Sequence, residues 1–158
     1  MTARLGAYQP EHGPIVVGWI HTVDEAEAWV SRDRLPVLED LARWHAEPDV
    51  YPFAWLEGET LVGYGEIWED LEEQEAELAR LVIAPEHRGR GHGRAMTRAL
   101  ADAAHRRGFG AVWLRVVAEN GAARRAYEAA GFARATPEEE AAFNVGQPRA
   151  YVWMRDVT

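Results

Sequence analysis

The chain has 158 residues, no cysteine and a formal net charge of −9. This length predicts one domain over residues 1–158, large enough to bury a core without metal or disulfide staples. The lack of cysteine excludes disulfides, thiolate metal sites and a cysteine nucleophile, and the acidic balance argues against general nucleic-acid binding.

Targeting signals are not evident in the sequence. No apolar run approaches about 18 residues, so we expect no transmembrane helix and no membrane partner. The first ten residues lack the basic start and apolar stretch of a signal peptide. We therefore expect a cytoplasmic protein.

The N-terminal third predicts two helices. Thr22–Glu25 reads as a capping box before a helix that runs through roughly Arg34. Pro36 fits the first turn of a second helix, where its missing N–H does no harm, and Pro48 and Pro52 are expected to bracket the end of that helix. The tryptophans of this half are predicted to be core rather than a ligand cage: Trp19, Trp29, Trp44, Trp55 and Trp68.

Strands are predicted in the middle of the chain, at residues 53–56, 60–68 and 78–84. Gly63 and Gly65 interrupt the second of them, and glycine inside a strand marks a bulge or a close approach by another group. The acidic stretch Glu69–Glu75 is expected to form a hairpin tip.

Helices and strands alternate in the last third. The pattern predicts a helix over 93–107, a strand over 111–118, a helix over 120–130 with Asn120 as N-cap, a helix start at Thr136 and a strand over 150–154. The strand, helix, strand unit over 78–118 implies a right-handed parallel crossover. Antiparallel hairpins around it imply a mixed sheet.

A basic, glycine-rich turn between a strand and a helix is the most informative segment. It comprises Arg88, Gly89, Arg90, Gly91, His92, Gly93 and Arg94. The early N–H groups of a helix lack intrahelical partners and lie at the positive end of the helix dipole, where phosphate binds. Glycines allow close backbone approach, and arginines add forked donors. The turn therefore predicts a pyrophosphate site.

Other phosphate motifs fit this turn poorly. A Rossmann fingerprint needs a different glycine spacing, and a Walker loop needs a lysine, which the chain lacks. An RNA-contacting Arg-Gly turn is disfavoured by the overall acidity.

Two blocks of sequence resemble the GNAT superfamily of acetyl-CoA-dependent N-acetyltransferases. Residues 88–93 match its acyl-CoA signature, (Arg/Gln)-x-x-Gly-x-(Gly/Ala), and residues 120–132 look like its Asn-x-x-Ala-x-x-x-Tyr-x-x-x-Gly-Phe element. The resemblance implies an α/β (α+β) fold with a mixed, mostly antiparallel sheet flanked by helices. It also implies a splayed parallel strand pair that forms the acyl-CoA cleft.

The resemblance assigns roles to individual residues. The backbone of Leu81, Val82 and Ile83 would bind the pantetheine arm, and residues 88–94 would hold the pyrophosphate. Asn120 would contact the pantetheine and Tyr127 would lie near the cofactor sulfur. The implied activity is acetyl transfer from acetyl-CoA to a primary amine of a small amine, an aminoglycoside or polyamine, or a peptide N-terminus.

Direct attack by the amine is the expected mechanism. The only serine, Ser31, has no recognisable partner in the sequence, so an acyl-enzyme is disfavoured. Tyr127 is the candidate general acid, because a phenol is protonated at working pH, and a backbone N–H near residues 81–83 would meet the oxyanion. Glu77 and its rival Glu66 are candidate general bases; packing of Tyr127 and solvation of both glutamates are the alternatives.

The acceptor side is open at this level. Arg115 stands where ribosomal-protein alanine N-acetyltransferases tend to carry a base glutamate, which argues against that subgroup. The acidic hairpin Asp70–Glu77 favours a cationic acceptor, although solubility explains it equally well. No histidine spacing predicts a metal site. A non-catalytic acyl-CoA sensor is the alternative function, and family members often dimerise, so a homodimer is expected.

Overall fold

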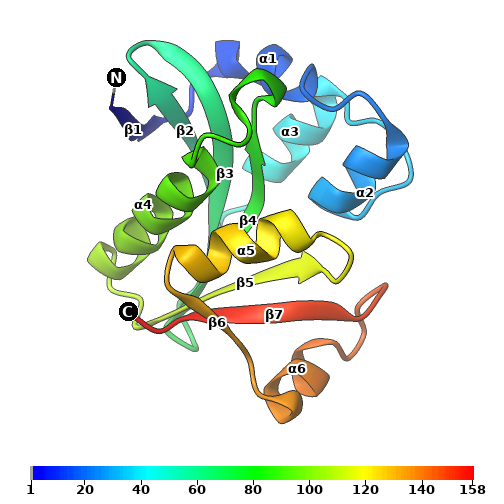
Figure 1. Ribbon diagram of the computed structural model, residues 1–158, viewed down its shortest axis with the longest axis vertical. Coiled ribbons are helices and arrows are strands. Elements are labelled where there is room, and N and C mark those ends of the chain that lie inside the picture. The colour runs from blue at the N-terminus through cyan, green and yellow to red at the C-terminus, as the bar shows by residue number, and fades with distance from the viewer. Residues whose placement is uncertain (1) are drawn as a thin grey trace.

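The computed structural model describes residues 2–158, which form a seven-stranded sheet with helices on its faces (Figure 1). The strand order is β1-β2-β3-β4-β5-β7-β6, and every neighbouring pair is antiparallel except β4 and β5. The strands are β1 (Ala3–Ala7), β2 (Val50–Glu57), β3 (Thr60–Asp70), β4 (Glu75–Ile83), β5 (Ala111–Val117), β6 (Phe132–Arg134) and β7 (Tyr151–Asp156). The expected mixed, mostly antiparallel sheet is confirmed.

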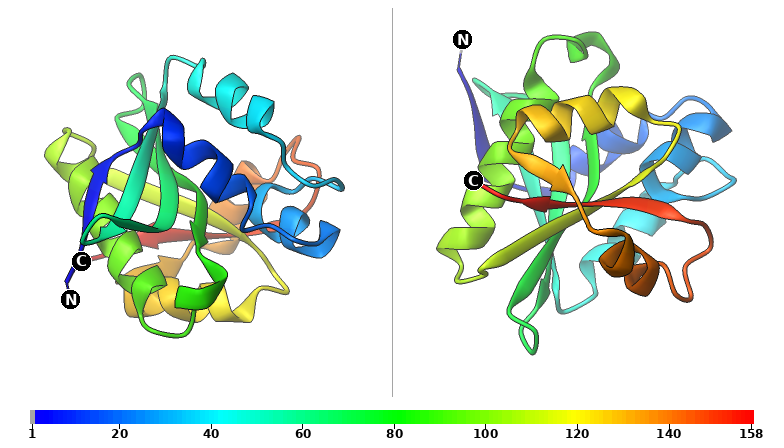
Figure 2. Two further views of the ribbon diagram at one scale, coloured as in Figure 1. Left: turned by 90° about the horizontal axis from the view of Figure 1, so that it is seen from above. Right: turned by 60° about the horizontal axis from the view of Figure 1, so that its bottom comes forward.

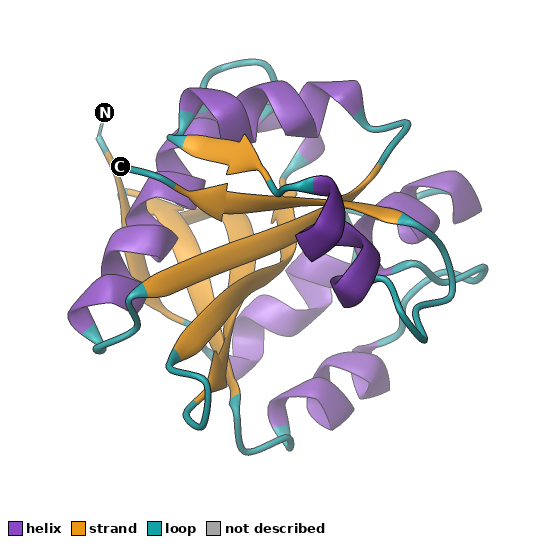
Figure 3. Ribbon diagram, turned by 90° about the horizontal axis from the view of Figure 1, so that it is seen from below, coloured by secondary structure: helices purple, strands orange, loops and turns teal. Residues whose placement is uncertain are grey.

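Six α-helices cover this sheet, and Figure 3 shows them by type. They are α1 (Gly13–Val17), α2 (Val23–Val30), α3 (Leu38–His45), α4 (His92–Arg106), α5 (Gly121–Ala129) and α6 (Pro137–Phe143). Helices α1 to α3 enclose one apolar cluster, α4 and α5 a second, and α6 packs on β7 (Figure 2). No helix in residues 2–158 is long and apolar enough to cross a bilayer.

Several predicted boundaries in the N-terminal third are wrong. Helix α2 ends at Val30 because Ser31 adopts a left-handed backbone, with φ of 57°, and the Ser31 hydroxyl accepts a hydrogen bond from the Tyr151 hydroxyl. The next helix begins at Leu38, two residues after Pro36. Pro52 lies within β2 rather than before it. Strands β1 and β6 and helix α1 are too short to give a periodic signal.

The parallel strands β4 and β5 separate part-way along their length. Their register runs only from Glu75 opposite Ala111 to Leu78 opposite Leu114, and the two ribbons diverge beyond it (Figure 1). The backbone of Leu81–Ile83 therefore has no strand partner on its β5 side. This divergence creates the predicted cleft.

Gly63 and Gly65 lie where the sequence predicted close approach or a bulge. A Cβ on Gly65 would lie 2.6 Å from Leu81 Cδ2 and 2.8 Å from Leu100 Cδ1. The register of β3 with β4 shifts at the same place, between Tyr64 and Glu66. Both expectations are met at Gly65, and the absence of a side chain there lets β4 and α4 pack tightly on β3.

Candidate active site

A cavity of about 310 Å³ lies where β4 leaves β5. Its walls come from the end of β4, the first turns of α4, and α5, with α2 on the opposite side. The residues that the sequence assigned to pantetheine meet here: Leu81, Val82, Ile83, Asn120 and Tyr127 all line it. The structure thus brings both sequence blocks and the β4 strand into one cleft.

A second cavity of about 190 Å³ adjoins the first. Trp29, Leu81, Asn120 and Tyr127 line both cavities, so these side chains form the boundary between them. Glu77 and Arg115 line only the second one. The arrangement offers two neighbouring cavities whose shared wall includes Tyr127.

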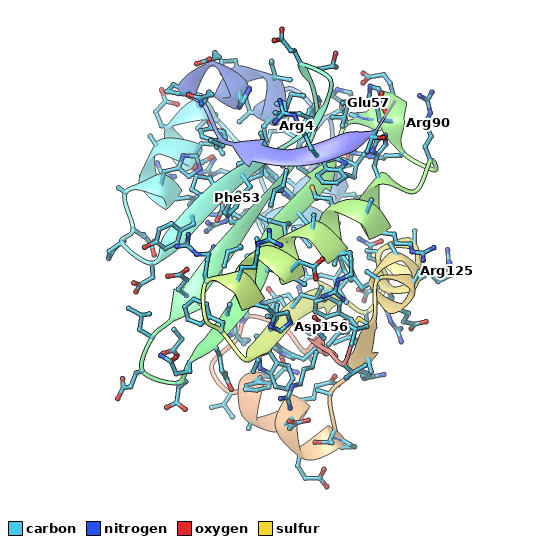
Figure 4. The ribbon with its side chains drawn as sticks, turned by 90° about the vertical axis from the view of Figure 1, so that its left-hand side faces the viewer. Arg4, Phe53, Glu57, Arg90, Arg125 and Asp156 are labelled. Atoms are coloured by element: carbon cyan, nitrogen blue, oxygen red, sulfur yellow. The ribbon has the colours of Figure 1, made fainter. Side chains whose placement is uncertain are left out.

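The glycine-rich turn leads directly into the N-terminus of α4. Gly89 and Gly91 have φ of 75° and 85°, and a Cβ on either would meet no atom within 4 Å. No side chain caps the helix at Gly91. The first N–H groups of α4 are therefore open to an anion, and Arg90 extends outward from the turn, as Figure 4 shows. Arg94 is also exposed, on the first turn of α4.

Arg88 is held at the mouth of the larger cavity. Its Nε donates to the carbonyl oxygen of Ile83 at 2.9 Å, and its Nη1 lies 3.4 Å from the carboxylate of Glu25 on α2. Since Arg88 and Glu25 both line the cavity, this exposed ion pair connects its two sides. An anion at the turn would compete with Glu25 for the guanidinium.

The His92 side chain is turned away from the larger cavity and toward β2. Its Nδ1 lies 3.1 Å from the indole nitrogen of Trp55, and its Nε2 lies 3.6 Å from the Glu57 carboxylate. Glu57, His87 and His92 form a group within ligand distance of one another, which sequence spacing did not predict. An indole N–H can only donate, so Nδ1 of His92 accepts from Trp55. The proton of the neutral ring is therefore on Nε2, and that nitrogen then has no free lone pair for a metal ion.

Asn120 and Tyr127 are placed by helix α5. The Asn120 side chain accepts from the N–H of Ala123 at 3.2 Å and caps the helix, as predicted. Tyr127 lies two turns further on, and burial raises the pKa of Tyr127 to about 12. Its phenol therefore remains protonated throughout the range in which proteins work.

Glu77 lies in the second cavity as one half of an ion pair. Arg115 Nε donates to it at 2.7 Å and Nη2 at 3.0 Å, while Nη1 donates to Gln147 at 2.9 Å. The guanidinium also lies 4.7 Å from the ring centre of Trp153. Arg115, the residue that departs from the ribosomal-protein acetyltransferase pattern, therefore forms an ion pair with Glu77, the first candidate base.

Glu66 lies outside both cavities. Its side chain is 0% exposed and accepts hydrogen bonds from Tyr64, Trp68 and Arg80, the last two at 2.7 Å. The structure therefore separates the two candidate bases, since only Glu77 faces an open space.

Most of the chain matches a known protein family. The model of the acetyltransferase (GNAT) family matches residues 17–132. The chain belongs to the GNAT family. The match includes the diverging strands, the turn and helix α5.

Relatives of known name match shorter segments of this GNAT chain. Streptothricin acetyltransferase of Streptomyces lavendulae is 38% identical over 73 residues, which are 46% of this chain and 39% of that protein. Ribosomal protein bS18-alanine N-acetyltransferase of Escherichia coli (strain K12) is 40% identical over 62 residues, or 39% and 42%. Mycothiol acetyltransferase of Streptomyces avermitilis is 54% identical over 50 residues, or 32% and 16%. Each match spans less than half of the relative.

Solved GNAT structures share the whole fold. Aminoglycoside acetyltransferase AAC(6')-Ib in complex with coenzyme A and kanamycin superposes with a TM-score of 0.75 at 19% identity, covering 98% of this chain and 94% of that one. Spermidine N-acetyltransferase from Vibrio cholerae, in complex with CoA and spermine, gives 0.74 at 19%, covering 97% and 92%. At this identity the likeness establishes the fold.

Carboxylates in this GNAT chain gather at two places. The hairpin acids Glu69, Asp70, Glu75 and Glu77 line one hollow, and of these only Glu77 reaches a central cavity, the smaller one. An open space beside the two central cavities, lined also by Ala28 and Asn120 of those cavities, has four carboxylates and one arginine in its wall. These charged residues are Asp24, Glu25, Glu27, Glu119 and Arg149. No local pattern predicts this grouping, because α2 and the β5–α5 loop are far apart along the chain.

Proposed function

We propose that this chain transfers an acetyl group from acetyl-CoA to a primary amine by direct attack within a ternary complex. The observation that carries the proposal is the position of Tyr127 on the boundary between two cavities, beside strands that have come apart. One cavity suits the cofactor arm, because the unpaired backbone of Leu81–Ile83 and the α4 turn both border it. The other suits the acceptor.

The turn and the strand would bind acetyl-CoA together. Open N–H groups at Gly91–Gly93, with Arg88, Arg90 and Arg94 nearby, fit a pyrophosphate. The unpaired edge of Leu81–Ile83 fits an extended amide-bearing chain, which would add to β4 as a further strand does. Asn120 lines the same cavity, where it would contact this chain.

Three protein groups would then act on the reacting atoms. As the acceptor nitrogen forms its bond to the thioester carbon, a backbone N–H of the Leu81–Ile83 segment stabilises the negative oxygen. As the carbon–sulfur bond breaks, Tyr127 gives its proton to sulfur. Glu77 is the base we propose for the amine proton, directly or through water, because it faces the acceptor cavity.

We further propose that the acceptor is cationic. The support is the set of carboxylates in the open space beside the acceptor cavity, where Asp24 and Glu119 have no ion-pair partner within residues 2–158. The structural neighbours include proteins solved with kanamycin and with spermine. Such a surface raises the local concentration of cationic amines.

The first test is calorimetric titration of acetyl-CoA into the wild type, Gly91→Asp and Gly108→Asp. Both glycines have positive φ and open space at Cβ, but they lie at opposite ends of α4. We expect Gly91→Asp to weaken binding at least about tenfold, since its carboxylate lies at the anion site. Gly108→Asp should bind as the wild type does.

Acetyl transfer is then measured as thiol release with an amine panel, which the absence of cysteine in the protein makes easy to read. Release with cationic amines above the rate with neutral ones supports both proposals. If the folded wild type does not bind acetyl-CoA, the proposal that the chain is an acetyltransferase is overturned. Binding without release from any amine indicates the alternative, a non-catalytic acyl-CoA-binding protein.

A further inference from the structure

Arg80 has an unusual backbone at the place where β4 leaves β5. It has φ of 51°, in the left-handed region that a residue with a side chain rarely adopts. The register pairs Glu66 with Ala79 and Tyr64 with Val82, so Arg80 and Leu81 together stand opposite Gly65. This is a β-bulge, which bends β4 two residues after its last pairing with β5.

Two contacts hold this bulge from different elements. The indole N–H of Trp29, on α2, donates to the carbonyl oxygen of Arg80 at 2.8 Å. The Arg80 guanidinium donates to buried Glu66 on β3 at 2.7 Å, and it lies over the rings of Trp44 and Trp68, at 4.0 Å and 4.8 Å from their centres. A left-handed residue persists only when its surroundings over-determine it, and here they do.

The hydrogen bond from Trp29 fixes more than one atom. A peptide unit is planar, and its carbonyl and N–H point in opposite directions. Holding the Arg80 oxygen therefore sets the orientation of the Leu81 N–H and of the segment that follows. Leu81–Ile83 is the segment that borders the cofactor cavity, and Trp29 itself lies on the boundary of both cavities.

We infer that Trp29 and Glu66 are positioning residues for acyl transfer, which hold the Arg80 bulge and thereby aim the backbone of Leu81–Ile83 at the reacting carbonyl. This inference rests on the proposed function. It gives Glu66 a role that agrees with its burial: the carboxylate does not line the acceptor cavity, and its oxygens are occupied by Tyr64, Trp68 and Arg80. Through this hydrogen bond Trp29 also links helix α2 to the bulge in β4.

The chain contains a matched control for Trp29. Trp44 packs edge-on against Trp29, with ring centres 5.6 Å apart, and its buried indole nitrogen has no hydrogen-bond partner within residues 2–158. Trp29→Phe removes an N–H that holds the bulge, whereas Trp44→Phe removes one without a partner there. Both substitutions keep an aromatic ring in the same cluster, so Trp44→Phe should retain an aromatic face beside the Arg80 guanidinium.

The experiment measures kcat, KM and the acetyl-CoA dissociation constant for both variants. For Trp29→Phe we expect kcat to fall about tenfold to a hundredfold, since displaced reacting groups lose that much. The acetyl-CoA dissociation constant should rise by a smaller factor, because Leu81–Ile83 also borders the proposed pantetheine site. Trp44→Phe should keep kcat. If kcat of Trp29→Phe equals that of Trp44→Phe, the inference is overturned, and the proposed function still stands.

Hydrogen exchange at Leu81–Ile83 gives a second readout that does not require activity. Exchange there should be faster in Trp29→Phe than in Trp44→Phe, because the peptide loses its anchor. Unchanged exchange in both contradicts the inference, even if the wild type proves inactive and the proposed function fails. If Trp29→Phe does not fold, Glu66→Gln tests the second anchor, with the same expected fall in kcat and the same contrary outcome.

Discussion

Tyr127 is the side chain on which the proposed chemistry depends most directly. Its burial raises its pKa to about 12, so it holds its proton across the whole working range. It adjoins both cavities, so in the proposed mechanism one acid would be within reach of both the cofactor and the acceptor. Tyr127 also packs against the core cluster, so substitution has to separate the two roles.

We therefore expect Tyr127→Phe to lower kcat by about a hundredfold or more, with little change in acetyl-CoA affinity. The measurement is steady-state kinetics beside calorimetry, with Tyr51→Phe, which lines neither central cavity, as control. Because the folded pKa is near 12, the wild-type rate should show no loss from Tyr127 ionisation below about pH 11. Full turnover in Tyr127→Phe would show that the phenol only packs.

At the scale of single elements, the absence of a side chain at Gly65 lets β3 pack closely against β4 and α4. Strand β3 passes so close to Leu81 and Leu100 that a methyl group would overlap both. Leu81 lines both cavities, so displacing it alters the site as well as the packing. The bulge in β4 stands opposite the same glycine.

Gly65→Ala should destabilise the fold by about 1–3 kcal/mol, the usual cost of overpacking, and weaken acetyl-CoA binding. Urea denaturation and calorimetry measure the two effects. Gly110→Ala is the control, because its Cβ would meet no atom within 4 Å and its φ is not positive. A Gly65→Ala variant as stable as the wild type would mean that Leu81 and Leu100 move aside without cost.

Capping signals in the sequence predicted helix starts well, whereas Pro36 marked a start two residues too early. The Thr22 capping box, the helix start at Thr136 and the Asn120 cap are all confirmed, because each depends on residues within one turn. The end of α2 at Val30 was missed, since Ser31 is held by Tyr151 from the far end of the chain. The bulge at Arg80 was missed for the same physical reason.

Across the whole molecule, Asp156 fastens the last strand to helix α4, and Figure 4 labels it between them. Arg98 Nη2 donates to it at 2.6 Å and His105 Nε2 at 2.8 Å. Burial alone would raise the pKa of Asp156, but the hydrogen bonds from Arg98, His105 and Thr158 outweigh it and hold that pKa well below its usual range. The contact joins residues more than 50 positions apart.

This lowered pKa predicts an acid-dependent loss of stability. A carboxylate whose folded pKa is depressed stabilises the protein above its unfolded pKa, near 3.9, and loses that contribution as the pH falls. Asp156→Asn should lower the free energy of unfolding by about 2–3 kcal/mol at pH 7, and its difference from the wild type should shrink below about pH 4. Urea denaturation at several pH values measures this, with Asp49→Asn as control, because that side chain is exposed; a constant difference would exclude the linkage.

The sequence by itself determined the family, the sheet class and the glycine-rich turn, because each depends on short-range patterns: glycines and arginines within seven residues, caps within four, and apolar periodicity within one element. Only the tertiary structure decided which glutamate lines a central cavity, which carboxylates group beside α2 and what shapes the cleft. Glu66 and Glu77 have similar local surroundings in the sequence. Their difference comes from Arg80, Arg115 and the tryptophans that the fold packs around them, and contacts across many tens of residues leave no periodic trace.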